Sequence, residues 1–87
     1  MKHPEKVFDN ETPFETGERL SYLRYDALEN LLKGIMVGLG EQAKQDKIKN
    51  RIQLANLGEK TAIDILEVTK EVEKMWRISK PHMNKEE

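Results

Sequence analysis

The chain contains no cysteine among its 87 residues, and aromatic residues, prolines and glycines are all few. Without cysteine it cannot form disulfides, a thiolate metal site or a thiolate nucleophile. A reducing compartment suits such a chain, and we expect a cytoplasmic protein. The first residues lack the apolar core of a signal peptide, so we expect no export. The longest uncharged apolar run, Gly34–Gly40, is far shorter than the roughly 20 residues that span a bilayer, so we expect no membrane association.

Charged residues are abundant, at 36% of the chain, whereas hydrophobic residues make up only 37%. Globular domains average about 25% charged residues, so this composition favours amphipathic helices with solvated outer faces. The net charge of −1 gives no overall attraction to nucleic acid or to an anionic membrane. These totals predict an all-α protein.

The N-terminal part combines an irregular segment with the start of a helix. Residues 1–16 carry two prolines and no hydrophobic periodicity, which predicts an extended N-terminal arm. Within it, Thr12–Glu15 has the form of a capping box, and Thr16–Glu18 offers a competing helix start. Apolar residues then recur at helical spacing from Leu20 onward, which predicts a first helix over about 18–38.

The stretch Gly34–Ala43 contains Gly-x-Gly-x-x-Ala, a pattern similar to a phosphate-binding turn. That turn requires a preceding strand, but the residues before it have helical period, and Glu41 would place a negative charge beside the phosphates. We therefore interpret the stretch as a helix end followed by a turn, with a positive φ at Gly38 or Gly40. Binding of NAD, ATP or any other cofactor is not expected.

A second, longer helix is predicted over about 41–78, because this segment lacks proline and is rich in Glu, Lys, Gln and Ala. It carries two apolar stripes that keep their phase across Gly58, which favours one continuous helix. A break at Gly58 and a new capping box at Thr61–Asp64 are the alternative. Residues 17–79 then form a single helical domain, and residues 80–87 a flexible C-terminal tail.

The predicted helices differ in length, at roughly 30 Å and 55 Å, so the first cannot cover the second. The uncovered stripe predicts a homodimer in the form of a four-helix bundle. A monomeric three-helix bundle with a turn at Gly58–Lys60 is the alternative. Candidate dimer-interface residues are Ile65, Val68, Val72, Met75 and Trp76.

Three basic residues of the second helix, Lys44, Lys47 and Arg51, are predicted to share one side. Such a ridge can neutralise phosphates, which makes nucleic-acid binding the alternative function. An ordinary solvated helix face explains the same residues and is favoured by the balanced charge.

No catalytic or metal site can be assembled from this sequence. His3 and His82 lie near opposite ends, without further ligands at suitable spacing, so we expect no metal. The acidic residues of the second helix alternate with basic ones at pairing distance. These pairs are Lys60–Asp64, Glu67–Lys70, Glu71–Lys74 and Glu73–Arg77. We therefore expect no enzyme, but a protein–protein interaction or regulatory module that binds a second copy or another protein.

Overall fold

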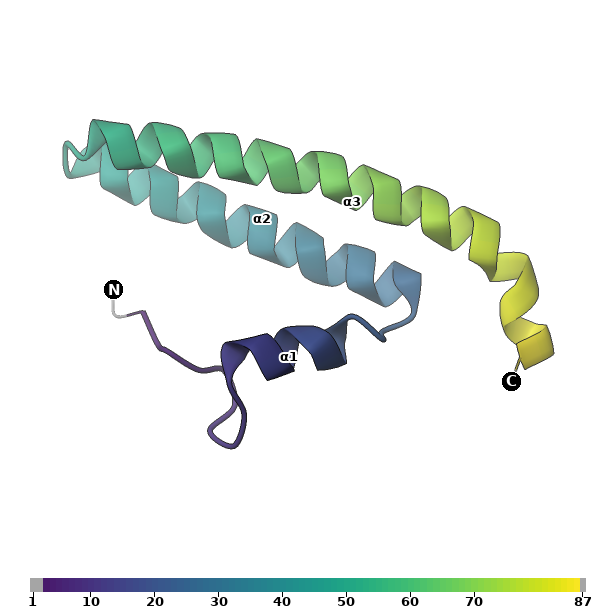
Figure 1. Ribbon diagram of the computed structural model, residues 1–87. Helices are drawn as coiled ribbons and strands as arrows, with labels where there is room; N and C mark the ends of the chain where they lie inside the picture. Colours follow the sequence, from purple (N-terminus) through teal and green to yellow (C-terminus); the bar gives the residue numbers. More distant parts are fainter. Residues whose placement is uncertain (1–2, 87) are drawn as a thin grey trace.

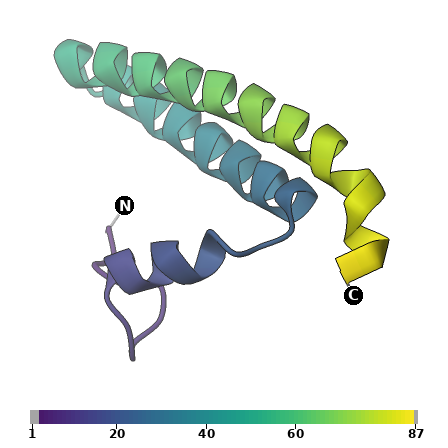
Figure 2. The same ribbon diagram turned by 45° about the vertical axis from the view of Figure 1, so that its right-hand side comes forward.

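The computed structural model describes residues 3–86, and every regular element in that range is an α-helix. Helix α1 spans Pro13–Leu20, α2 spans Tyr25–Ile48 and α3 spans Ile52–Glu86. Helices α2 and α3 lie side by side and antiparallel, whereas the short α1 lies on the side of α2 away from α3 (Figures 1 and 2). The prediction of an all-α fold is confirmed.

Helices α2 and α3 meet along a seam formed by one heptad pattern on each helix. In each pattern the inward positions alternate at spacings of three and four residues. This period of 3.5 is typical of helices that wrap around each other in a coiled coil. Every one of these positions is buried or half-buried. They are Tyr25, Glu29, Leu32, Met36, Leu39, Ala43 and Asp46 on α2, and Ala55, Gly58, Ala62, Ile65, Thr69, Val72, Trp76 and Ser79 on α3.

The size of the inward residues changes along the hairpin. Near the turn they are small, and a Cβ added to Gly58 would lie 3.3 Å from the Cβ of Ala43. At the opposite end they include Trp76, over which the Arg24 guanidinium lies 5.4 Å from the ring centroid. Since small residues let two helices approach closely, the ribbons lie nearest at the turn and spread toward the other end (Figure 1).

The turn between α2 and α3 lies at residues 49–51, not at the glycines, so the predicted helix end is wrong. No described glycine has a positive φ, whereas Asn50 has a φ of 61°. The Arg51 N–H donates to the Asp46 carbonyl at 2.7 Å, and the Asn50 N–H to the Lys47 carbonyl at 3.0 Å. These two bonds form a Schellman motif, in which asparagine accepts the left-handed conformation that ends the helix.

Helix α3 runs without a break through Gly58, so the predicted continuity is confirmed and the alternative turn at Gly58–Lys60 is not formed. The hydroxyl of Thr61 donates to the Leu57 carbonyl at 2.8 Å, which places it inside the helix and not at a new N-terminus. The helix begins at Ile52 instead of about residue 41, because residues 41–48 complete α2. It continues past Pro81 to Glu86, into the segment predicted as a tail.

The capping box predicted at Thr12–Glu15 is confirmed. The Glu15 N–H donates to the Thr12 hydroxyl at 3.2 Å, and the Thr12 N–H donates to the Glu15 carboxylate at 2.9 Å. Pro13 occupies the first helical position, where a missing N–H costs nothing. Helix α1 therefore takes its first residues from the end of the predicted arm, and residues 21–24 separate it from α2.

Candidate interaction surface

The interface between α2 and α3 leaves much apolar surface uncovered. Among the described residues, the buried hydrophobic side chains are Ala43, Ala55 and Val72. A larger set of bulky apolar side chains is exposed. This set comprises Val7, Phe8, Phe14, Tyr22, Leu23, Ile35, Val37, Ile48, Ile52, Leu54, Leu57, Ile63, Val68, Met75 and Ile78.

Several of the exposed apolar side chains share one broad side of the hairpin. At about 100° per residue, these side chains lie to one side of the seam on each helix. The close approach of Gly58 to Ala43 fixes the register in which the two helices are paired. Antiparallel pairing brings the two rows to the same side. We call this side the open face, and it consists of Leu31, Ile35, Leu54, Leu57, Val68 and Met75.

The open face carries little charge along its length. The positions that follow the helical period through it are uncharged on α2, and on α3 only Asp64 and Glu71 are charged, although 36% of the whole chain is charged. The uncharged positions are Ala27, Leu31, Ile35, Gly38 and Gln42 on α2, and Leu54, Leu57, Thr61, Val68 and Met75 on α3. A solvated helix face normally carries charges, so this pattern is typical of a face that contacts another apolar surface.

The opposite side of the hairpin is charged. Lys33 pairs with Glu29 at 3.0 Å on α2, and Arg77 pairs with Glu73 on α3. The hydrogen bond and then the charge of Arg77 hold the pKa of Glu73 below its usual value, and the charge of Lys33 lowers it further. Since Lys33 acts on Glu73 across the two helices, both residues lie on this second side. We call it the charged face, although the exposed apolar side chains of Val37 and Ile63 also lie on it.

The five candidate dimer-interface residues divide between the seam and the open face. Val72 is buried between α2 and α3, and Ile65 and Trp76 are half-buried there. The expectation that the first helix leaves this stripe uncovered is therefore wrong, because α2 extends to Ile48 and lies along it. Val68 and Met75 remain on the surface and are the two most exposed of the five.

The predicted basic ridge does not form on one helix. Lys44 and Lys47 belong to the end of α2, whereas Arg51 lies in the turn. Lys44 lies 3.5 Å from the Glu41 carboxylate, and Arg51 lies 3.5 Å from that of Asp46. These acidic neighbours offset the positive charge that phosphate binding would require.

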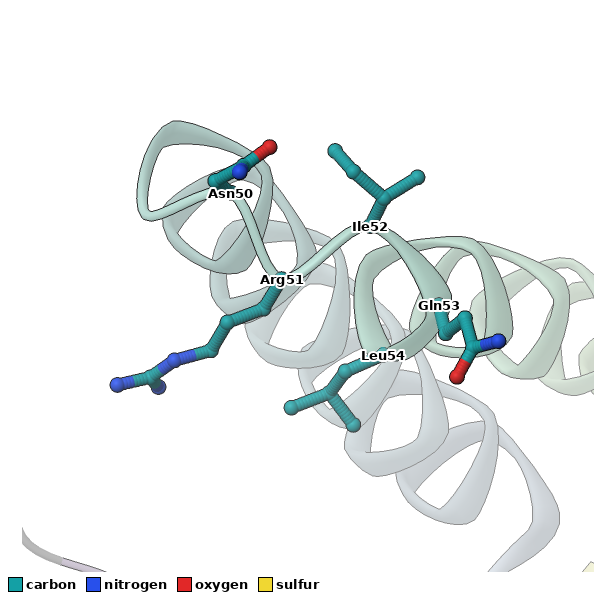
Figure 3. Close-up of a pocket in the computed structure, with 5 residues that line it drawn as sticks. All are labelled: Asn50, Arg51, Ile52, Gln53 and Leu54. Carbon is teal, nitrogen blue, oxygen red and sulfur yellow. The ribbon is translucent and has the colours of Figure 1, made fainter.

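A shallow hollow lies at the turn, lined by the consecutive residues 50–54 (Figure 3). The side chains of Arg51 and Leu54 point to one side of the chain and that of Ile52 to the other (Figure 3). Since one short segment lines the hollow and its polar groups diverge, it lacks the convergent groups of a small-molecule site.

Other predicted features of the sequence carry no chemistry in the fold. The stretch Gly34–Ala43 lies inside α2, so its N–H groups are engaged in the helix and form no phosphate cradle. His3 and His82 are exposed at opposite ends of the described chain. Across residues 3–82, no cluster of three or more His, Asp or Glu side chains could hold a metal ion. Within residues 3–86, no helix combines the length and apolarity needed to cross a membrane.

Three of the ion pairs expected on the long helix form in α3. Lys60 lies 2.9 Å from Asp64, Lys70 lies 3.6 Å from Glu67, and Arg77 pairs with Glu73. All are exposed, so each contributes at most about 0.5 kcal/mol to helix stability. These ion pairs help to keep the solvent-exposed sides of α3 hydrated.

No protein-family model matches the chain, and no curated protein or solved structure shows significant similarity to it. Among the features described above, the open face is the candidate functional surface of this fold.

Proposed function

We propose that this protein is an interaction module whose open face is the surface that binds another protein chain. The observation that supports the proposal is a largely uncharged apolar side that runs along both long helices of a highly charged chain. Binding and, through it, regulation require no catalytic group, which agrees with the residues available on this side.

The energetics favour a covered open face. Val68 is 49% exposed and Leu57 is 61% exposed, so each leaves about half of its side chain in water. Full burial of a Val, Leu or Ile side chain is worth about 1.5–3 kcal/mol relative to exposure. Several such residues together supply a driving force comparable with the whole stability of a small domain.

The surface is also rigid enough to present its side chains in a fixed pattern. Ile35, Leu57 and Val68 all lie within continuous helices, not on loops. A partner therefore meets preorganised rows of side chains and loses little conformational entropy in ordering them.

Site-specific photo-crosslinking tests this proposal in the cells that produce the protein. A photoreactive amino acid replaces Val68 on the open face or, as the matched control, Ile63 on the charged side of α3. We expect protein adducts from position 68 and few from position 63. Equal yields from the two positions, or no protein adduct from position 68, would contradict the proposed function.

A further inference from the structure

The protein has the shape of a single layer of helices. Its dimensions are 53 × 31 × 13 Å, and the smallest is about the diameter of one helix. The radius of gyration is 15.8 Å, whereas a compact domain of this length has about 12 Å. In a single layer, each helix has solvent on both broad sides, so one seam alone must bury all apolar groups.

The exposed area measures how much cover is missing. The accessible surface is 7311 Å² for a chain of 10.2 kDa, whereas a folded monomer of that mass exposes about 5,300 Å². The excess is about 2,000 Å². Permanent homodimers bury a total of about 2,000–5,000 Å², which corresponds to about 1,000–2,500 Å² for each protomer. The excess, to which exposed residues outside the hairpin such as Phe14 and Tyr22 also contribute, is large enough for one permanent dimer interface.

We propose that the occupant of the open face is a second copy of the chain, packed open face to open face in a bundle of four long helices. This inference rests on the proposed interaction function and names its partner. It places Ile35, Val68 and Met75 inside the dimer, while Ile65, Val72 and Trp76 stay within each hairpin.

A second copy fits this surface because the surface carries little charge. A two-fold interface brings the same patch of both protomers together, so charges on the patch would meet like charges. The acidic side chains on this surface are Asp64, which is already paired with Lys60, and Glu71, one helical turn before Met75. In the dimer both charged faces, with Lys33 and its neighbours, remain in solvent, as a soluble four-helix bundle requires.

Helix α1 of the same chain is too short to serve as the cover. It has eight residues and is about 12 Å long, whereas the longest dimension of the molecule is 53 Å. The connection at residues 21–24 also holds it near the end of the hairpin that lies away from the turn. Folding α1 back would therefore cover only the part of the open face nearest Leu31, and would leave Leu57 in water.

Sedimentation equilibrium of the full chain tests the inference with two matched pairs of variants. Val68→Asp and Ile35→Asp place a charge on the open face, whereas Ile63→Asp and Val37→Asp change somewhat more exposed residues outside it. We expect a mass of about twice 10.2 kDa for the wild type and both controls. The open-face variants should dissociate at least about 100-fold more readily, because a charge cannot be buried unpaired in an apolar interface.

Cysteine labelling keeps the inference testable if the aspartate variants do not fold. The natural chain has no cysteine, so Val68→Cys and Ile63→Cys each report on one position. We expect maleimide to label position 68 more slowly as the protein concentration rises, while position 63 stays reactive. A monomeric wild type, or loss of reactivity at both positions alike, would overturn the dimer.

The two proposals fail in different ways. If cellular adducts from position 68 contain only other proteins, and the purified chain is a monomer, the interaction function stands and self-association is wrong. If position 68 gives no adduct in cells, the interaction function itself fails.

Discussion

The two ends of the hairpin are held together in different ways. Near the turn, α2 and α3 approach through Ala43, Ala55 and Gly58, and the Asn50 motif closes the connection. At the other end, Val72 and Trp76 fill a wider seam, and no turn joins the two helices. The turn end therefore depends on the absence of side-chain volume, whereas the far end depends on its presence. Adding side-chain volume should therefore destabilise the turn end most, and removing it should destabilise the far end most.

The largest effect is expected where volume is added near the turn. Ala43 is 1% exposed, so Ala43→Leu would force the helices apart or its own side chain into a strained rotamer. We expect a loss of about 3 kcal/mol in the free energy of unfolding, measured by urea denaturation. The matched control is Ala27→Leu, which adds the same volume to a half-buried position at the wide end. An equal loss for both would show that the two ends do not differ.

Removing volume at the far end should be the next largest effect. Val72→Ala deletes two methyl groups from a side chain that is 7% exposed. We expect a loss of about 1.5 kcal/mol in the free energy of unfolding, from about 0.8 kcal/mol for each buried carbon. Val37→Ala removes the same groups from an exposed position of α2 and serves as the control. A loss for Val37→Ala as large as that for Val72→Ala would contradict the assigned seam.

Structural features that are encoded by a pattern over many residues could be predicted from the sequence, whereas a feature that depends on one residue could not. Helical period recurs over many residues, so the all-α class, the capping box at Thr12 and continuity through Gly58 were predictable. The turn depends on one asparagine, Asn50, whose signal is weaker than that of Gly38 and Gly40 nearby. Packing along the seam keeps those glycines helical, and no local pattern reports that contact.

The candidate surface was predictable only in part, for a related reason. Val68 and Met75 were identified as apolar residues with no cover, and both lie on the open face. Ile35 was missed as a member of the same surface, because the register in which α2 pairs with α3 cannot be read from either helix alone. Because the turn was predicted at the glycines, residues 41–48 of α2 were assigned to the second helix instead of the first.

A test of the turn itself follows from the conformation of Asn50. Its φ of 61° is left-handed, a conformation that costs most L-residues about 1–2 kcal/mol and glycine almost nothing. Asn50→Ala should therefore lower the free energy of unfolding by about 1 kcal/mol, whereas Asn50→Gly should leave it unchanged or raise it slightly. Thermal and urea unfolding of the two variants provide the measurement. A destabilising glycine would mean that the asparagine side chain makes a necessary contact.

Glycines inside the helices give a smaller effect that again separates two environments. A Cβ at Gly34 meets no atom within 4 Å, whereas a Cβ at Gly58 meets Ala43. Gly34→Ala should raise the free energy of unfolding by about 0.5–1 kcal/mol through helix propensity. Gly58→Ala should give less, because Ala43 must move by a few tenths of an ångström. A greater gain at Gly58 would show that the helices near the turn are not closely packed.

The smallest expected effect is a loss of stability at acid pH, which depends on the charged side chains and not on the apolar seam. Hydrogen bonds with Arg77 hold the pKa of Glu73 below its usual 4.5, and hydrogen bonds with Thr12 do the same for Glu15. A lowered folded-state pKa gives stability that is present above the unfolded-state pKa and is lost as the pH falls through the folded-state pKa. The melting temperature should therefore be flat near neutrality and should decline slightly as the pH falls below about 4.5. Glu73→Gln should make that decline shallower, because glutamine does not titrate. If the decline instead begins well above pH 4.5, or if Glu73→Gln leaves it unchanged, then the acid response does not come from this pair.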